Sequence, residues 1–300
     1  MFETTGLITS PLNYIGGKYK LLPQLLPLFP HNIGTFVDLF CGGANVGINV
    51  SANTIIFNDN LVYLIDLYEA FLDRSREETI SYIENRINEF SLSLSNREGY
   101  LSLRDEYNAN RNPLDLFVLV AYSFNHQIRF NNSHQFNCPF GFNRSSYNPH
   151  IKYNLVRFID LLKEKNVQFS AFNFDEYDFT SLSVDDFVYA DPPYLITTGS
   201  YNDGKRGFTG WDQLSEFKLL KTLDALNVKN VKFGLSNVLH HKGKTNQILL
   251  SWIENNGYHV NYLNKDYSNC NYQTRNRSKD ASVEVLITNY VPIEKDLKLW

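Results

Sequence analysis

The strongest constraint on the fold is the segment of residues 35–59, where two apolar, strand-like runs enclose a glycine-rich turn. Residues 35–39 predict a buried strand that runs directly into Phe40-Cys41-Gly42-Gly43-Ala44-Asn45-Val46-Gly47 and then a helix to about Val50. A second strand over residues 54–57 ends at Asn58-Asp59-Asn60. This order of strand, glycine turn, helix, strand and acid is typical of a βαβ unit that binds nucleotides. We therefore expect an α/β domain.

The rest of the chain separates into a helical section and a second α/β section. A helix is expected over residues 19–29, and helical periodicity continues at residues 61–72, 77–90, 97–108 and 113–125. Strands are expected at 167–172, 186–190, 231–235, 258–263 and 284–290, and helices at 212–226 and 244–255. A crossover between parallel strands needs only about a dozen residues, so the roughly 100 residues between the second and third strands exceed that need. We predict a doubly wound, mostly parallel sheet from residues 1–65 and 149–300, with an inserted helical domain over 66–148.

The inserted domain is expected to carry a β-hairpin. Residues 127–130 and 135–138 read as short strands, and Asn131-Asn132-Ser133-His134 lies between them. Asparagine and serine favour turns because their side chains bond to nearby backbone groups.

A second motif, Asp191-Pro192-Pro193-Tyr194, follows the strand expected at 186–190. The two prolines remove backbone donors and stiffen the turn. The turn then presents a carboxylate, free carbonyls and an aromatic ring where open α/β sheets bind ligands. Asp191 and the Pro192 carbonyl can each accept one hydrogen of an exocyclic amino group and direct its lone pair at an electrophile, while Tyr194 stacks on the ring. The alternative is a surface turn, but the position after a buried strand favours a catalytic one.

The charges are unevenly distributed. The net charge is −4, which by itself argues weakly against a nucleic-acid partner. Residues 116–159, however, contain no Asp or Glu; their basic side chains and histidines are Arg129, Arg144, Lys152, Arg157, His126, His134 and His150. A second basic cluster consists of Lys265, Arg275, Arg277 and Lys279. Locally basic faces on an acidic protein favour contact with DNA phosphates, and a neutral, Asn-rich surface is the alternative.

Taken together, these motifs resemble the D12 class of DNA N6-adenine methyltransferases, close to the Dam-type (alpha) group. The resemblance covers nearly the whole chain. Its motifs are Asn13–Lys18, Phe36–Gly43, Asn58-Asp59, Asp191–Tyr194, Phe233–Asn237 and Glu284–Tyr290. Its most specific part comprises Phe124-Asn125, Arg129-Phe130-Asn131 and Gln135–Gly141, which is similar to the target-reading hairpin of enzymes whose sites begin with GAT.

The resemblance implies a Rossmann-like methyltransferase in which residues 66–148 form the target-recognition domain. It further implies that S-adenosylmethionine donates a methyl group to an adenine flipped out of double-stranded DNA. The implied catalytic residues are Asp191, Pro192, Pro193 and Tyr194. The implied cofactor-binding residues are Tyr14, Lys18, Asp38, Gly42, Asp59, Asn173 and Phe174, of which Asn173 and Phe174 contact either the cofactor or the target base. The implied DNA-reading residues are Asn125, Arg129, Asn131, Asn137 and Pro139, for GATC or another site beginning GAT.

Several positions depart from the family pattern. Relatives often have Glu at the position of Asp38, a proline at Leu39 and a third glycine at Ala44. Many also have Asp at Asn173, and a small residue and a leucine at His126-Gln127. The last pair lies beside the hairpin, so these differences bear on the DNA site more than on the chemistry.

Four other functions share some of these sequence features. The glycine turn and Asp59 alone would also suit a nicotinamide-dependent dehydrogenase, which gives Asp191–Tyr194 no role. Cytosine-C5 methylation needs a Pro-Cys nucleophile, but this chain has Cys138-Pro139 in the reverse order. Cytosine-N4 methylation and a catalytically inactive DNA-binding module stay open.

The remaining expectations concern partners and location. His240 and His241 lack a third ligand, so no metal is expected. Three distant cysteines, short apolar runs and a start without signal-peptide features predict a cytoplasmic protein without a membrane segment. A cognate restriction endonuclease is a further expected partner. Tyr201 and Phe208 belong to the Gly/Lys/Arg-rich residues 199–210. They are expected either in the core or in a loop that lies over DNA.

Overall fold

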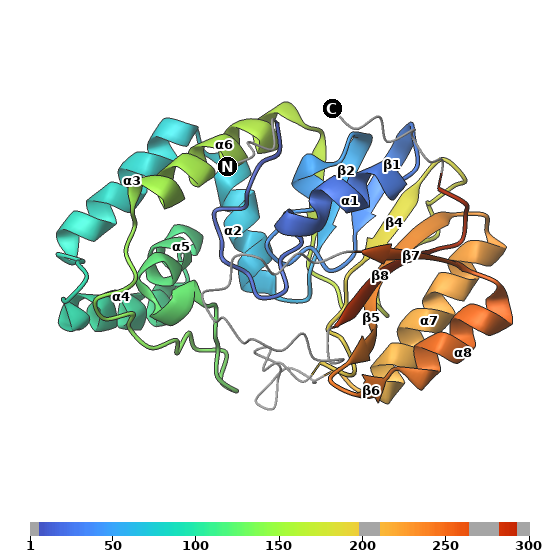
Figure 1. The fold of residues 1–300 in the computed structure, drawn as a ribbon. Coiled ribbons are helices and arrows are strands. Elements are labelled where there is room, and N and C mark those ends of the chain that lie inside the picture. Colours follow the sequence, from blue (N-terminus) through green and yellow to red (C-terminus); the bar gives the residue numbers. More distant parts are fainter. Residues whose placement is uncertain (1–5, 198–210, 264–281, 293–300) are drawn as a thin grey trace, which may run out of the picture.

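A computed structural model describes residues 6–197, 211–263 and 282–292 (Figure 1). Within these ranges eight strands form one sheet in the order β3-β2-β1-β4-β5-β8-β7, and β6 pairs with β5. The strands are β1 (Ile33–Asp38), β2 (Ala52–Asn58), β3 (Val167–Ser170), β4 (Phe187–Ala190), β5 (Lys232–His241), β6 (Lys244–Thr245), β7 (His259–Leu263) and β8 (Val283–Thr288). The first five along the sheet are parallel; β8 runs antiparallel to β5, and β7 runs antiparallel to β8. Strand order reverses between β1 and β4, which is where doubly wound sheets bind ligands.

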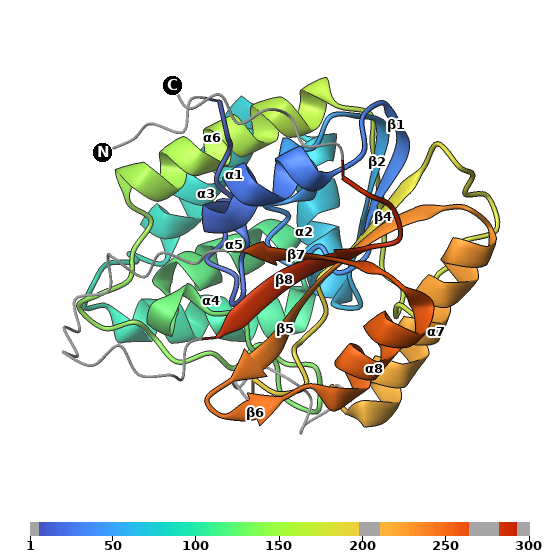
Figure 2. The same ribbon diagram turned by 45° about the vertical axis from the view of Figure 1, so that its right-hand side comes forward.

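Helices cover both faces of the sheet. The helices α1 (Leu22–Leu25), α2 (Val62–Asp73) and α6 (Pro149–Glu164) lie on one face, and α7 (Gln213–Val228) and α8 (Gln247–Asn256) on the other (Figure 2). Side chains along a strand alternate between faces. Accordingly, Phe36 belongs to the core under α1, α2 and α6, and its neighbour Val37 to the core under α7 and α8. The doubly wound, mostly parallel sheet is confirmed.

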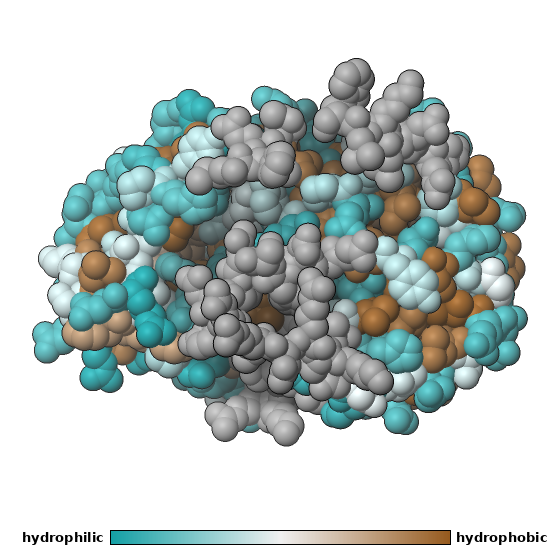
Figure 3. All heavy atoms as spheres, in the orientation of Figure 1, coloured by the Kyte–Doolittle hydropathy of each residue, from teal (hydrophilic) through white to brown (hydrophobic). Residues whose placement is uncertain are grey.

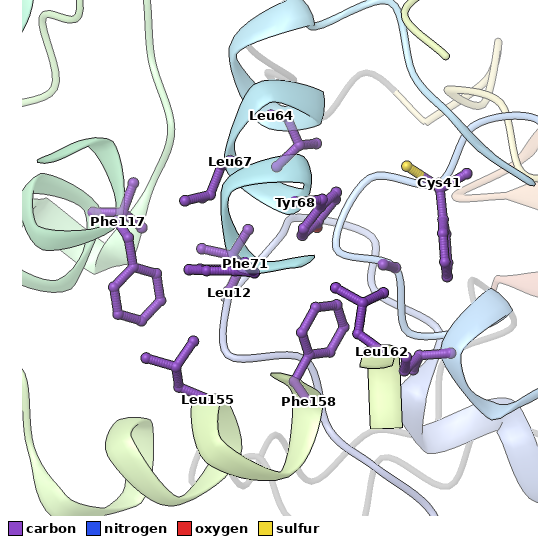
Figure 4. Close-up of a cluster of buried hydrophobic side chains, with 14 of the residues drawn as sticks. Leu12, Cys41, Leu64, Leu67, Tyr68, Phe71, Phe117, Leu155, Phe158 and Leu162 are labelled. Atoms are coloured by element: carbon purple, nitrogen blue, oxygen red, sulfur yellow. The ribbon is translucent and has the colours of Figure 1, made fainter. Parts of the chain in front are cut away.

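Three further helices extend the first layer away from the sheet. They are α3 (Arg76–Glu89), α4 (Arg97–Asn110) and α5 (Pro113–Tyr122), on the left of Figure 1. Four side chains of α2, namely Leu64, Leu67, Tyr68 and Phe71, lie between Phe117 of α5 and Phe158 of α6 (Figure 4). One continuous core thus joins these helices to the sheet, and the limits of an inserted domain at residues 66–148 stay a prediction.

Two helices differ from expectation near the glycine turn. The helix predicted up to Val50 is wrong: only a 3₁₀ turn, Gly47–Asn49, follows. Val50 is already extended and β2 begins at Ala52, so there is no room for a second turn. The helix predicted over residues 19–29 is broken into α1 and two 3₁₀ turns, because Pro23 and Pro27 each begin a new turn.

The sequence reading also missed α6 and overstated the hairpin. The α6 helix begins with Asn148 as N-cap and Pro149 in its first turn, a recognisable start signal. Residues 127–130 and 135–138 do not form strands; they are joined by a single bridge between Phe130 and Phe136. The hairpin path is present, but its strands are not.

The surface of the described residues is uneven in polarity. Hydrophobic side chains gather on the right of Figure 3, over the α7–α8 layer. Three apolar side chains on α7, those of Leu214, Phe217 and Val228, are exposed. No helix in the described ranges is long and apolar enough to cross a bilayer.

Candidate active site

A cavity of about 580 Å³ opens at the carboxyl ends of β1, β2 and β4. Its volume lies within the range of small-molecule and cofactor sites. Strand order reverses between β1 and β4, so the loops that follow these two strands diverge and leave this space between them. Its walls include residues from the N-terminal loop, the glycine turn, the Asp191 turn and the base of the hairpin: Asn13, Tyr14, Lys18, Asp38, Gly42, Asp59, Gln127, Phe130, Asn173, Phe174, Asp191, Pro193 and Tyr194.

The glycine turn is held by the carboxylates of Asp59 and Asp38, and the Tyr14 ring packs against Gly42. Gly42 has φ +45°, and a Cβ at this position would lie 2.9 Å from the ring of Tyr14. Asp59 accepts a hydrogen bond from the Gly42 amide at 3.0 Å with one oxygen and from the Leu61 amide at 2.9 Å with the other. Asp59 therefore fixes the turn and the start of α2 as well as facing the cavity.

Asp38, the last residue of β1, is almost fully buried. Its Oδ2 accepts a hydrogen bond from the Gly47 amide at 2.9 Å. Burial raises the pKa of Asp38 to about 7, against the opposing effect of that hydrogen bond. A cationic ligand in the cavity would favour the ionised form.

Four side chains form a buried polar cluster around the Asp191 turn. Lys18 Nζ lies 2.8 Å from Asp191 Oδ2 and 3.5 Å from Glu284 Oε1. The Tyr194 hydroxyl lies 3.1 Å from Asp191 Oδ1 and 3.1 Å from Glu284 Oε1. Burial raises the pKa of Asp191, and the Lys18 ammonium opposes this shift. The catalytic residues predicted from the tetrad thus meet a lysine from the N-terminal loop and a glutamate from β8.

An aromatic wall lies beside the tetrad. Trp211 contacts both Phe40 and Phe174, with ring centroids 5.8 and 5.3 Å apart. Its indole N–H donates to the buried carboxylate of Glu216 at 2.7 Å. Glu216 also accepts hydrogen bonds from Asn237 and Asn246, so Trp211 is anchored from within the α7–α8 layer. Such a wall can stack on a purine.

The DNA-reading residues expected from the sequence lie next to the cavity rather than in its wall. Arg129 donates from Nε to Asn137 Oδ1 at 2.9 Å and from Nη2 to the Asn137 carbonyl at 2.8 Å. Asn131 accepts bonds from the Ser133 and Gln135 amides and so forms the turn. Asn125 and Pro139 are exposed. The five residues share one segment, but three of them, Arg129, Asn131 and Asn137, also maintain its shape.

Some expectations lie outside the described residues. They concern Tyr201, Phe208, Lys265, Cys270, Arg275, Arg277 and Lys279. Pro192 is buried and does not line the cavity, unlike Pro193 and Tyr194. Among the described side chains, no group of three or more His, Cys, Asp or Glu is arranged to hold a metal ion.

Sequence reasoning missed Glu284, Trp211, Glu216 and Asn108. Glu284 is 3% exposed in the apolar strand Val283–Thr288, and an acid in such a strand was a usable signal. Asn108 donates to the Phe136 carbonyl and accepts from its amide, so it replaces a partner strand. Nothing in the spacing of residues 108 and 136 indicated that contact.

The cavity suits S-adenosylmethionine on structural grounds. The close approach at Gly42 leaves no room for a side chain, and two carboxylates, Asp38 and Asp59, face a space where a sulfonium and an ammonium would need negative charge. The aromatic wall offers a surface for the adenine ring. These features belong to the residues themselves and do not depend on any comparison.

Comparison of the sequence with known proteins shows which family the chain belongs to. The model for D12 class N6 adenine-specific DNA methyltransferases matches residues 14–269. The chain is 52% identical over 293 residues to the type II methyltransferase M.FokI of Planomicrobium okeanokoites, covering 98% of this chain and 44% of that protein. It is 51% identical over 288 residues to the modification methylase StsI of Streptococcus sanguinis, covering 96% of this chain and 44% of that protein.

A more distant relative is the DNA adenine methylase of Escherichia coli K12, 29% identical over 197 residues, or 64% of this chain and 66% of that protein. The chain spans about 44% of the length of the two curated relatives to which it is more than half identical. Because the family model covers most of its residues, the chain belongs to the D12 class of N6 adenine-specific DNA methyltransferases.

Proposed function

We propose that this chain is a site-specific DNA methyltransferase that transfers a methyl group to the N6 amino group of adenine in double-stranded DNA. The observation that carries the proposal is the Asp191–Tyr194 turn at the carboxyl end of β4, beside a cavity with the features of a cofactor site. Membership of the family and the modification methylases among its relatives support it.

S-adenosylmethionine is the proposed cofactor, and it supplies the methyl group on a positively charged sulfonium. Asp38 and Asp59 supply negative charge to the cavity, and Tyr14 closes over the glycine turn. Lys18 is proposed to hold Asp191 rather than the cofactor, because its Nζ lies 2.8 Å from that carboxylate.

Asp191 is proposed to accept a hydrogen bond from the amino group of a flipped adenine, with the Pro192 carbonyl as a second acceptor. These bonds reduce the conjugation of the nitrogen lone pair and direct it at the methyl group. Tyr194 and the aromatic wall of Phe40, Phe174 and Trp211 are proposed to hold the two rings, and Asn173 lies next to that wall. A duplex base reaches this cavity only if it leaves the helix.

The segment containing Asn125, Arg129, Asn131, Asn137 and Pro139 is proposed to read the DNA sequence. An arginine in the major groove pairs with the O6 and N7 atoms of guanine. A site beginning with GAT stays a prediction. The greater similarity to type II methyltransferases than to DNA adenine methylases favours a site other than GATC. The same similarity supports a cognate restriction endonuclease as partner, and a cytoplasmic location with it.

The test combines methyl transfer with mapping of the product. The purified protein is incubated with S-adenosylmethionine carrying a tritiated methyl group and plasmid DNA from a host without adenine methylation. Single-molecule sequencing of the product then identifies the modified base and its site. N6-methyladenine at one short sequence is the expected result.

Each alternative gives a different result in the same experiment. N4-methylcytosine would show that the amino group of cytosine is the target. DNA binding without any methyl transfer would indicate an inactive binding module. Binding of a reduced nicotinamide, detected by its fluorescence, without S-adenosylmethionine binding would indicate a dehydrogenase.

A further inference from the structure

The Tyr194 hydroxyl has two carboxylate acceptors but only one proton. It lies 3.1 Å from Asp191 Oδ1 and 3.1 Å from Glu284 Oε1. A phenolic hydroxyl donates one hydrogen bond and can accept others. When it donates to one of these carboxylates, its oxygen can accept a hydrogen bond from the other group once that group is protonated.

Lys18 also lies between the two carboxylates of the cluster, Asp191 and Glu284. Lys18 Nζ lies 2.8 Å from Asp191 Oδ2 and 3.5 Å from Glu284 Oε1, and the side chains of Lys18 and Glu284 are both buried. Lys18 Nζ also donates a hydrogen bond to the Gly16 carbonyl at 3.0 Å. A buried charge without an opposite charge nearby is destabilising. When Asp191 is neutralised, Glu284 is placed to supply the negative charge near Lys18.

Glu284 reaches this position because β8 is antiparallel to β5. Its backbone pairs with Val238 of β5 and Leu263 of β7. The beginning of β8 therefore lies at the same edge of the sheet as the carboxyl ends of β4 and β5. A parallel strand would have placed its second residue at the opposite edge.

We infer that Glu284 is a positioning residue. When Asp191 receives the proton released by methyl transfer, Glu284 accepts the hydrogen bond of the Tyr194 hydroxyl and serves as the charged partner of Lys18. This inference rests on the proposed function. In the reaction, the S–CH₃ bond breaks with its electron pair left on sulfur, the N6–CH₃ bond forms, and one N6–H proton passes to Asp191. Asp191, now neutral, donates to the Tyr194 oxygen, and the Tyr194 proton turns to Glu284. Lys18 keeps a charged partner throughout.

The test is a double-mutant cycle with two conservative variants, Glu284→Gln and Tyr194→Phe. Tyr194→Phe keeps the ring for stacking and removes the hydroxyl. Single-turnover transfer of tritiated methyl to plasmid DNA without adenine methylation is measured for the wild type, both variants and the double variant. We expect each single variant to be at least about 30-fold slower. The double variant should be within about threefold of Tyr194→Phe, because residues that act as a unit are not additive.

Two further measurements distinguish positioning from a structural role. Calorimetric affinity for S-adenosylmethionine and the midpoint of thermal unfolding should change little in Glu284→Gln. The matched control is Asp186→Asn, a buried carboxylate before β4 that bonds the Thr35 amide at the opposite edge of the sheet. Its transfer rate per folded molecule should equal that of the wild type.

The inference is overturned if Glu284→Gln transfers at the wild-type rate, if the two effects multiply, or if the rate and cofactor affinity fall in parallel by more than tenfold. If Glu284→Gln does not fold, a wild-type rate in Tyr194→Phe overturns it equally. A wild-type protein that methylates no DNA would instead overturn the proposed function, and this inference with it.

Discussion

The sheet edge and the hairpin segment are built by different means. The sheet edge comprises residues 38–47, 58–61 and 191–194, and its backbone follows directly from paired strands and buried carboxylates. The hairpin segment, residues 123–145, has one bridge within its turn and one at its base, and is further held by local backbone turns and by side chains. Arg129 bonds to Asn137, Asn108 to Phe136, and Tyr100 to the Cys138 carbonyl.

Backbone conformation shows the same contrast. Four non-glycine residues of the hairpin segment have positive φ, namely Asn125, His126, His134 and Asn143. Two of them, Asn125 and His126, are adjacent and directly precede Gln127, which lines the cavity. Such conformations are costly without surrounding support and concentrate at functional sites. The comparison indicates that the proposed catalytic residues are placed by the sheet, whereas the segment proposed to read DNA depends on turns and on a few side chains for its shape.

The largest expected effect is at the sheet edge. Asp191→Ala should lower turnover by about 10³-fold, because the adenine amino group loses its charged acceptor. DNA and cofactor affinities should change little. The measurement is single-turnover methyl transfer, with exposed Asp178→Ala as the matched control. More than about a tenth of wild-type turnover in Asp191→Ala would show that the carboxylate is not catalytic.

A pH effect of the sheet edge comes next. The pKa of Asp38 is raised to about 7 from an ordinary value near 4, so the folded protein binds a proton between these pH values that the unfolded chain does not. Stability should therefore fall as pH rises from about 4 to 7, by at most about 1.4 kcal/mol per pH unit from this group, and level off above. Urea unfolding at successive pH values measures this slope. Asp38→Asn should flatten it, and an unchanged slope in that variant would assign the effect to Asp59 or Asp191, whose pKa values are also raised.

Asp59→Ala tests the cofactor side of the same edge. Losing a charged acceptor should weaken S-adenosylmethionine binding by roughly 1.5–3 kcal/mol. Calorimetry measures the affinity, and Asp66→Ala, one turn into α2 and outside the cavity wall, is the control. Unchanged affinity in Asp59→Ala would show that Asp59 has only a structural role, which is to accept hydrogen bonds from the Gly42 and Leu61 amides.

Arg129→Ala tests the hairpin segment. If the guanidinium reads a guanine, discrimination at one base pair should relax by about 1–3 kcal/mol. Methylation rates are measured on duplexes substituted one position at a time. Tyr100→Phe is the matched variant, since it removes one hydrogen bond that supports the segment, to the Cys138 carbonyl, and leaves the Arg129 guanidinium in place. An equal loss on every duplex in both variants would mean that Arg129 supports the segment rather than reads DNA.

The smallest effect is expected at Ala44, which has φ +57° in the glycine turn. Ala44→Gly should relieve about 1–2 kcal/mol of strain but lose about 0.8 kcal/mol from a buried methyl group and some further free energy from the freer unfolded chain. The free energy of unfolding should stay within about 1 kcal/mol of the wild-type value in urea titrations. A loss of more than 2 kcal/mol would show that packing of the methyl group outweighs the strain.

The sequence by itself determined most strands of the sheet and many of the residues that line the cavity. The βαβ pattern, the glycine turn, Asp59 and the Asp191–Tyr194 turn were all visible, because strand ends and turn residues leave short-range signals. Their meeting at one edge also followed, since parallel strands share their carboxyl ends. The α6 helix was missed although Asn148 and Pro149 mark its start.

Only the tertiary structure determined the contacts between site residues that lie far apart in the sequence. Glu284 meets Tyr194 because β8 runs antiparallel, and no local pattern fixes strand direction. Trp211 is held beside the cavity because its indole N–H donates to the buried Glu216 carboxylate, which also accepts hydrogen bonds from Asn237 and Asn246. The outer side of the hairpin is held by Asn108 of α4, which bonds both the amide and the carbonyl of Phe136. Each of these contacts joins residues far apart in the chain, and their energy depends on burial that the sequence alone does not reveal.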